Sequence, residues 1–447
     1  MRPRLARLPS PARSGRLTGA GLLVAGILAL ALNLRAMITS VPPLFPELSS
    51  TLGLSSAVLA VLAAVPVLCF GVFSGVAAPL SRALGEERVL GWALLLLAAG
   101  LALRGAAPGL LLFPGTILAC GSVALMNVLL PSMIKRRSPD RAGLLIGLYL
   151  MAMSGGAIIA SLIAVPVFDA AGGGHFAARL SLGLWAAPAA AGALSWLPQM
   201  RTSGLRAGPA PRFPASAGGQ AGRQGADGQA GGLAGRQGAD GQTDGQAGQR
   251  GVLVMAGYPL AWQVMLFMGL QSLFYYASIS WFPTLLRDRG VSAAAAGGLL
   301  ALMNLGNAVT ALVVPVLAHR ATDQRMLVTA AIVADAAGLI GGAFGPLAGV
   351  PAFVLVMGLG QGATLGLGIF FTMARAPDPV TAASLSAFAQ GAGYLLASIG
   401  PLAVGLLHAA TGGWTIPMLC LLATVAAQLA SGLLAGRNLT VPAAAAR

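Results

Sequence analysis

A permanently charged side chain lies in the middle of a long apolar stretch near the start of the chain. Arg35 falls within residues 18–41, which contain no other charged residue. A stretch of that length can cross a bilayer as a helix, because about 20 apolar residues span the hydrocarbon core. A guanidinium at that depth costs at least about 2.5–3.5 kcal/mol on insertion scales, and arginine keeps its proton there. Intramembrane charges usually face a protein interior or a watery cavity. Arg35 therefore predicts a site for an anionic or strongly polar ligand.

Three polar neighbours of Arg35 are candidates for the same site. Thr39 follows Arg35 by one helical turn and so shares its face of a helix. Asn33 lies on a different face and could contact the neighbours of Arg35 or another helix. Ser40 could bind a solute or bond to the backbone of its own helix, as hydroxyl groups in helices often do.

A second wall is expected from residues 259–282, in which Gln271 and Tyr275 have the four-residue spacing of one helical face. Tyr276 and Trp281 follow closely; a place in the aromatic belt at the membrane surface is the alternative for both, and we expect it for Trp281. Other polar side chains in apolar stretches could contact a solute or bond between helices. They are Asn127, Asn304, Asn307, Gln361, Gln390 and Tyr394.

Acidic residues are scarce at depth. Asp335 is the only acid in the middle of an apolar stretch, and it could carry a coupling proton or form a structural pair with another buried group. Glu47 lies just beyond the first apolar stretch and is expected to be a solvated residue at the mouth. The histidines and cysteines are scattered, with no metal-ligand or catalytic spacing. We therefore expect neither a metal nor a cofactor, and no enzymatic activity.

The composition is that of a membrane protein. Hydrophobic residues make up 57% of the chain and charged residues 9%, whereas soluble domains contain roughly 25% charged residues. A net charge of +15 could indicate nucleic-acid binding. The arginines other than Arg35, however, lie between apolar stretches or near their ends and form no patch interleaved with aromatic residues, so no nucleic-acid partner is expected. The expected partners are the lipid bilayer and a small solute, and the protein is expected to be a monomer.

Twelve apolar stretches are long enough to cross a bilayer as helices. They cover residues 18–41, 57–79, 89–107, 109–133, 143–167, 177–197, 259–282, 293–317, 326–345, 349–373, 382–407 and 414–435. If the N-terminus is cytoplasmic, the segments on that side contain 22 Lys and Arg residues and those on the other side contain 4. This bias predicts that both termini are cytoplasmic.

The arm at residues 1–17 is rich in arginine and free of acids. A mitochondrial transit peptide is the alternative to a basic flank of the first helix, which we expect. The expected location is a bacterial cytoplasmic (inner) membrane, crossed several times.

The two halves of the chain resemble each other across a polar segment. Residues 199–251 are rich in Gly, Gln, Ala and Asp, with one nine-residue repeat at 221–229 and 234–242, and predict a flexible linker. The pattern Arg-x-Pro-Asp at 137–140 recurs at 375–378, an offset of 238 residues, and Asn33 corresponds to Gln271 at the same offset. We expect five parts. They are a basic arm (1–17), a six-helix bundle (18–198), a cytoplasmic linker (199–257), a second six-helix bundle (258–436) and a tail (437–447).

Four motifs resemble the cyanate and 2-nitroimidazole transporter branch of the major facilitator superfamily. They are NLRAMITSVPPL at 33–44, PSMIKRR at 131–137, YASISWFP at 276–283 and AFAQGAG at 387–393. The loop at 81–88 departs from the acidic and basic signature common elsewhere in that superfamily. The resemblance covers nearly the whole chain outside the linker. It implies an all-α fold of twelve transmembrane helices in two parallel six-helix repeats, with a site near the midplane between the halves.

The resemblance further implies a secondary transporter that moves a small polar or anionic solute by alternating access of the two halves. No phosphate-binding loop of the type Gly-x-x-x-x-Gly-Lys-Ser/Thr occurs, so ATP is not expected to drive transport. Transport is expected to be driven by an ion or solute gradient or to proceed by facilitated diffusion. Efflux of toxic or drug-like compounds is the first alternative, and a membrane-embedded sensor is a remote one. Glycines at 155–156, 391 and 393 predict helix faces that pack closely, and Gly156 could also take part in alternating access.

Overall fold

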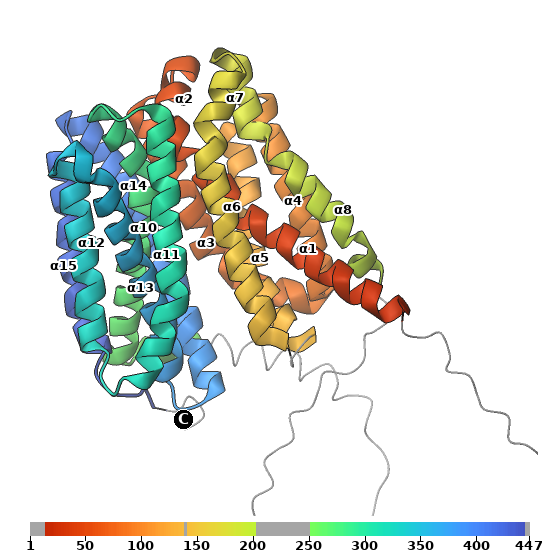
Figure 1. The fold of residues 1–447 in the computed structure, drawn as a ribbon. Helices are drawn as coiled ribbons and strands as arrows, with labels where there is room; N and C mark the ends of the chain where they lie inside the picture. The colour runs from red at the N-terminus through yellow and green to blue at the C-terminus, as the bar shows by residue number, and fades with distance from the viewer. Residues whose placement is uncertain (1–13, 138–140, 203–250, 443–447) are drawn as a thin grey trace, which may run out of the picture.

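The computed structural model describes residues 14–137, 141–202 and 251–442, which fold as helices and short connections (Figure 1). The first half contains α1 (Ser14–Thr39), η1 (Pro42–Leu44), α2 (Phe45–Leu52), α3 (Ser56–Leu84), α4 (Glu86–Ala106), α5 (Leu112–Arg137), α6 (Ala142–Ala170), α7 (Gly174–Gly183) and α8 (Ala186–Thr202). The second half contains α10 (Pro259–Asp288), α11 (Ala293–Arg320), α12 (Arg325–Phe344), η4 (Leu347–Gly349), α13 (Val350–Ala374), α14 (Pro379–Thr411) and α15 (Thr415–Ala435). Most of the predicted N-terminal arm and linker lie outside the described residues.

The all-α prediction is confirmed, and each of the twelve predicted stretches corresponds to helix. Among the described residues, eleven segments are long and apolar enough to cross a membrane. They do not include α10, whose Gln271, Ser272 and tyrosines lower its mean hydropathy. The sixth predicted stretch is divided between α7 and α8, and Pro188 lies in the first turn of α8, where its missing N–H costs little. The short helix α2 was not expected from the sequence.

Equivalent helices of the two halves begin in the same way. Ser55 precedes α3 and accepts a hydrogen bond from the backbone N–H of Val58. Ser292 precedes α11 and accepts one from the backbone N–H of Ala295. Each hydroxyl satisfies a donor that the first helical turn leaves free. The two caps therefore occupy matching positions in the two repeats.

The two halves meet through two equivalent pairs of helices, because α3 packs against α14 and α11 packs against α6. Small residues allow both contacts. A Cβ atom at Gly71 of α3 would lie 2.7 Å from the side chain of Leu395 on α14. One at Gly297 of α11 would lie 2.6 Å from the carbonyl oxygen of Ser161 on α6. Exchange of the halves converts one pair into the other, as two parallel repeats require.

The halves approach each other at one end of the molecule. We call the end where α1 begins and α8 ends the proximal end, and the end that carries α2 and α7 the distal end (Figure 1). At the distal end, a Cβ at Gly405 of α14 would lie 2.5 Å from the Cβ of Ala60 on α3. Toward the proximal end, a Cβ at Gly75 of α3 or Gly147 of α6 would have no neighbouring atom within 4 Å. The ribbons of α6 and α11 diverge in the same direction (Figure 1).

Within each half, a glycine seats the first helix against the fifth. Gly156 of α6 packs on α1, where a Cβ would lie 2.1 Å from the carbonyl oxygen of Leu32. In the second half Gly393 of α14 packs on α10, where a Cβ would lie 3.3 Å from the Cα of Gly269. The packing role predicted for these glycines is confirmed. For Gly155 and Gly391 the packing prediction is wrong, because neither has a neighbour within 4 Å at its Cβ position.

The two adjacent glycines of α6 provide a matched test of this packing. We expect Gly156→Ala to destabilise the protein by about 1–3 kcal/mol, because a backbone carbonyl blocks the added methyl group. Gly155→Ala should leave stability unchanged or raise it slightly, since alanine favours helix and open space receives its methyl group. Thermal unfolding of the two purified variants measures this difference, and equal melting temperatures would contradict it.

Candidate functional site

A chain of hydrogen bonds crosses between the halves beside Arg35. Nη1 of Arg35 on α1 donates to the hydroxyl of Tyr275 on α10, at 2.5 Å. That hydroxyl donates in turn to Oδ1 of Asn304 on α11, at 3.0 Å, and the amide of Asn304 donates to the carbonyl of Leu300. The Arg35 guanidinium also lies over the Tyr275 ring, 4.8 Å from its centre, within the range of a cation–π interaction. The sequence-predicted Arg35, Tyr275 and Asn304 thus come together.

Tyrosines form the electrostatic surroundings of Arg35. Tyr276, Tyr394 and Tyr149 lie in the neighbourhood of Arg35 beside Tyr275, and these are four of the five tyrosines in the chain. In the described part of the chain, no carboxylate acts on this guanidinium. Arg35 is nevertheless only half-buried, although it lies deep in the bundle. The cation therefore has no ion-pair partner among the residues that the structure describes.

A phenyl ring from the first half packs against this tyrosine cluster. Phe70 of α3 lies 6.2 Å from the ring of Tyr276 and 5.7 Å from the ring of Tyr394, between ring centres. Because the tyrosines belong to α10 and α14, both contacts join the halves. Tyr394, predicted as a site residue, is half-buried and lies at this contact.

Amide groups from α10 and α13 form a second polar layer. Nε2 of Gln271 donates to the backbone carbonyl of Gln361, at 3.5 Å, and Oε1 of Gln271 accepts from Ser272. The side-chain amide of Gln361 is fully buried, and neither of its polar atoms has a hydrogen-bond partner among the described residues. Nδ2 of Asn307 is also without one. Buried amide atoms normally have partners, so these three atoms form an unsatisfied polar layer between the helices.

The other candidates on α1 bond to backbone and do not reach Tyr275. The amide of Asn33 donates to a carbonyl one turn earlier in its own helix, at 2.8 Å. The hydroxyl of Thr39 donates to the carbonyls of Arg35 and Ala157, at 3.1 and 3.2 Å, and so joins α1 to α6. Ser40 donates to its own helix at 3.4 Å. All three side chains are buried, and the hydroxyls of Thr39 and Ser40 bond to backbone as in helix packing, whereas Oδ1 of Asn33 has no partner among the described residues.

Two further predicted amides have side-chain partners. Oδ1 of Asn127 on α5 accepts from the hydroxyl of Tyr149 on α6, at 3.2 Å, which places Asn127 at the edge of the tyrosine cluster. The amide of Gln390 on α14 donates to Oγ of Ser386, at 2.8 Å. Asn127 and Gln390 are both half-buried, so each keeps surface for a further contact.

Asp335 lies away from the tyrosine cluster, on α12. It is fully buried, and neither carboxyl oxygen has a hydrogen-bond partner among the described residues. Its Oδ1 packs against the backbone of α13, where a Cβ at Gly360 would lie 2.5 Å away. The structural pairing considered for Asp335 is therefore not found in the described part of the chain. Gly360 precedes Gln361, so Asp335 contacts the helix that holds the second polar layer.

An ion pair joins the halves at the distal end. Nη1 of Arg287 on α10 lies 2.6 and 2.7 Å from the two carboxylate oxygens of Glu47 on α2. Their side chains are only 23% and 14% exposed, so the pair is partly shielded from water. The expectation that Glu47 is a solvated residue at the mouth is wrong, because α2 turns it toward α10.

Aromatic rings continue this distal contact. Trp281 of α10 lies 5.4 Å from Phe45 of α2 between ring centres, and its indole N–H donates to the carbonyl of Pro401. It is 2% exposed. The expectation that Trp281 belongs to an interfacial belt is wrong, because α2 and α14 cover it.

Tyr149, Phe70 and Arg287 complete these contacts and were missed by the sequence reasoning. A usable signal existed for Tyr149, since tyrosine is rare in this chain and Tyr149 lies inside an apolar stretch. Phe70 is one phenylalanine among 15, and Arg287 has the position of an ordinary loop residue. For Phe70 and Arg287, only the way in which the two halves pack shows which residue each one contacts.

Comparison with known proteins agrees with this architecture. The family model described as Major Facilitator Superfamily matches residues 24–401. The 2-nitroimidazole transporter of Escherichia coli is 36% identical over 416 residues, covering 93% of this chain and 95% of that protein. The cyanate transport protein CynX of Escherichia coli is 28% identical, covering 88% and 93%. Among solved structures, a bacterial homologue of the human lysosomal transporter Spinster superposes with a TM-score of 0.69 at 16% identity, covering 94% and 97%.

The distal ion pair can be tested by a double-mutant cycle. We expect Glu47→Gln and Arg287→Gln each to lower thermal stability, and the double variant to lose less than the sum. The coupling between two shielded, directly bonded charges should be about 0.5–3 kcal/mol. The matched control is the pair Asp323 and Arg325, 3.7 Å apart and about half exposed, for which the coupling should be near zero. Equal coupling in the two cycles would show that the distal pair does not hold the halves together.

Proposed function

The chain belongs to the major facilitator superfamily and is a transporter of small solutes, and we propose that its solute is a small anion or a compact polar molecule bound at Arg35. The proposed route is alternating access, in which the two six-helix halves rock about this central site. A small carboxylate, a cyanate-like anion and a nitroimidazole-like molecule all fit the chemistry of the site.

The observation that carries this proposal is the half-buried, unpaired cation. Arg35 bonds to one phenol and lies near three more, and no carboxylate of the described residues forms an ion pair with it. An unpaired charge away from water is costly unless a ligand or water completes its bonding. Because tyrosine hydroxyls both donate and accept, they can bind a solute while leaving the positive charge for an anion.

The geometry of a guanidinium narrows the class of solute. Its planar fork of N–H donors matches two coplanar oxygens, as in a carboxylate. A nitro group presents two coplanar oxygens in the same way, and cyanate presents a compact negative charge. The relatives named for 2-nitroimidazole and for cyanate therefore support a solute that meets the cation with such a group.

The bond from Arg35 to Tyr275 suggests how solute binding is coupled to movement. Arg35 belongs to the first half and Tyr275 to the second. A solute oxygen that takes the place of the Tyr275 hydroxyl changes a contact between the halves. The distal ion pair and aromatic rings close one end in this conformation, while the proximal helix ends diverge. Arg82, Arg320 and Arg325 lie at the proximal ends of α3, α11 and α12, so we propose that this end faces the cytoplasm of a bacterial inner membrane.

The Arg35 site can be tested by transport in liposomes. We expect Arg35→Gln and Arg35→Lys to weaken uptake and binding of radiolabelled cyanate and benzoate by about 10- to 150-fold, the loss of a charged hydrogen bond. Lysine should rescue little, because it lacks the planar fork. Arg88→Gln, which removes an exposed arginine, is the control. Wild-type affinity for both probes in Arg35→Gln, with the protein folded, would remove Arg35 from the site.

We further propose that Asp335 carries the coupling proton. A buried carboxyl without hydrogen bonds is far more stable neutral than charged. Loss of its proton would force α13 or α12 to move, because Asp335 packs directly against the α13 backbone. Movement of α13 would in turn reach the layer at Gln271 and Gln361.

The role of Asp335 can be tested by comparing two transport assays, solute exchange and accumulation driven by a pH gradient. We expect Asp335→Asn to exchange labelled for unlabelled solute at the wild-type rate but to lose accumulation driven by a pH gradient. Asp323→Asn, at an exposed position, should retain both. Gradient-driven accumulation in Asp335→Asn at the wild-type level would show that Asp335 is not the proton site.

A further inference from the structure

The hydroxyl group of Tyr275 has no proton left for a solute. A guanidinium carries N–H donors and no acceptor, so the phenol oxygen must be the acceptor in its bond with Arg35. The single proton of the hydroxyl is then directed to Oδ1 of Asn304, at 3.0 Å. Tyr275 thus accepts from one neighbour and donates to the other.

The side chain of Asn304 is held so that only its oxygen faces Tyr275. Its Nδ2 donates to the backbone carbonyl of Leu300, at 2.9 Å, and a carbonyl oxygen can only accept. The amide nitrogen is therefore fixed on that side and the amide oxygen on the other. Tyr275 and Asn304 are each 3% exposed, so water has little access to the bond between them.

The two bonds of Tyr275 respond differently when the halves move. The bond with Arg35 crosses between the halves, whereas the bond with Asn304 lies within the second half, because α10 and α11 both belong to it. Rocking of two rigid halves changes the first bond and leaves the second intact. A phenol displaced from Arg35 by an anion therefore keeps its proton on Asn304 and presents only lone pairs to the solute.

A second phenol in the neighbourhood of Arg35 is bonded in a similar way. The hydroxyl of Tyr149 on α6 donates to Oδ1 of Asn127 on α5, at 3.2 Å. One tyrosine from each half thus donates its proton to an asparagine, Tyr149 to Asn127 and Tyr275 to Asn304. Neither phenol has a free O–H to offer to a bound anion.

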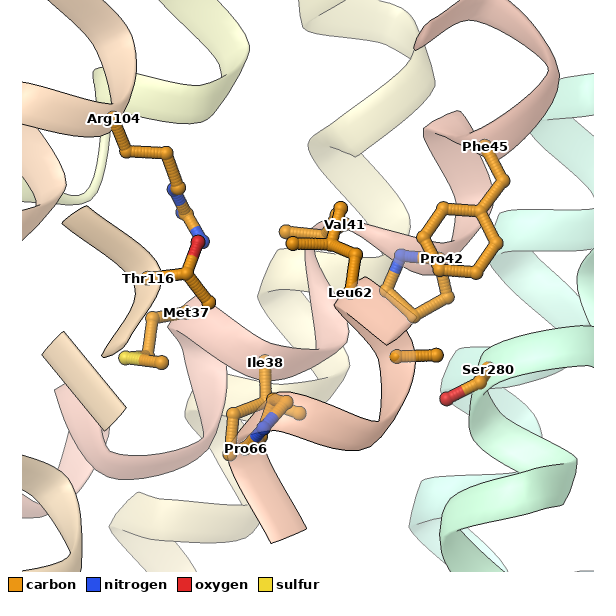
Figure 2. A pocket seen from close by; sticks show the side chains of 11 residues that line it. Met37, Ile38, Val41, Pro42, Phe45, Leu62, Pro66, Arg104, Thr116 and Ser280 are labelled. Atoms are coloured by element: carbon orange, nitrogen blue, oxygen red, sulfur yellow. The ribbon is translucent and has the colours of Figure 1, made fainter. Parts of the chain in front are cut away.

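The space on the distal side of Arg35 is too small for a solute. Residues between 37 and 42 line a small pocket near Arg104 there, with Ser280 of α10 on the opposite wall (Figure 2). The space open to the centre of a water molecule in this pocket is about 20 Å³, which is room for about one water. A solute at Arg35 therefore lies level with Tyr275 or on its proximal side.

We propose that Asn304 is a positioning residue that makes the site select solutes with an N–H or O–H group next to the anionic group. The anionic group takes donors of Arg35, and the neighbouring N–H or O–H donates to the phenol oxygen of Tyr275. A solute with a lone pair at that position meets the lone pairs of Tyr275, because Asn304 holds the phenol proton on the other side. This selection rests on the proposed anion site at Arg35.

Two ring carboxylates of similar size and equal charge test the selection. Pyrrole-2-carboxylate has an N–H beside its carboxylate, and furan-2-carboxylate has a ring oxygen in the same place. Their displacement of radiolabelled benzoate from the purified full-length protein measures both affinities. We expect pyrrole-2-carboxylate to bind about 5- to 150-fold more tightly, because furan-2-carboxylate leaves a buried acceptor without a donor. Equal affinities, or tighter binding of furan-2-carboxylate, would overturn the proposal.

Variants of the second half test whether Asn304 sets this preference. Asn304→Leu removes the acceptor, so the Tyr275 proton can turn to the furan oxygen and the preference should largely disappear. Tyr275→Phe should also remove the preference, and the double variant should show no further change, because Asn304 acts through Tyr275. Thr310→Val, which removes a hydrogen bond from α11 to α13, is the control and should keep the wild-type preference. An unchanged preference in Asn304→Leu would overturn the proposal.

Arg35→Gln separates this proposal from the anion site on which it rests. It should weaken the binding of all three carboxylates. If it does so while the wild-type protein shows no preference between pyrrole-2-carboxylate and furan-2-carboxylate, the anion site stands and the role of Asn304 is refuted. If all three affinities stay unchanged in Arg35→Gln, the anion site is refuted, and the role of Asn304 with it.

Discussion

The hydrogen bond between Arg35 and Tyr275 is the contact around which the site and the two halves are arranged. It joins the two halves at mid-depth and leaves a full positive charge facing phenols. A carboxylate in place of Tyr275 would neutralise the cation and leave little reason for a solute to bind. A phenol satisfies one donor and can be displaced, because its hydrogen bond to the cation is worth only about 1.5–3 kcal/mol. The hydrogen bond from Tyr275 is therefore strong enough to stabilise Arg35 in the absence of solute and weak enough for an anion to displace it.

The C-terminal end of α1 and the segment that follows it contact the second half at three successive levels between mid-depth and the distal end. Arg35 meets the second half at mid-depth, residues 37–42 line the pocket near Arg104, and Glu47 meets Arg287 at the distal end. Each level pairs a residue of the first half with α10. A movement of α10 relative to α1 therefore changes all three levels together, as rocking of two rigid halves requires.

Much of the architecture could be predicted from the sequence, because membrane thickness fixes helix length and burial of a charge is rarely without purpose. Arg35 and the wall of Gln271 and Tyr275 follow from that reasoning. Backbone bonding by Thr39 could not be predicted, since a hydroxyl on a helix has the same spacing whether it faces a cavity or a carbonyl. The pairing of Glu47 with Arg287 depends on how α2 folds back over α10, which local pattern does not specify.

The most direct test of the central claim is to locate a bound anion. Crystals of the wild-type protein grown with 4-bromobenzoate would show the ligand by the anomalous scattering of bromine. We expect a bromine peak between α1 and α10, with the carboxylate on the Arg35 guanidinium and the bond from Arg35 to Tyr275 broken. A fully occupied ligand elsewhere, with that bond intact and no peak within reach of Arg35, would contradict it.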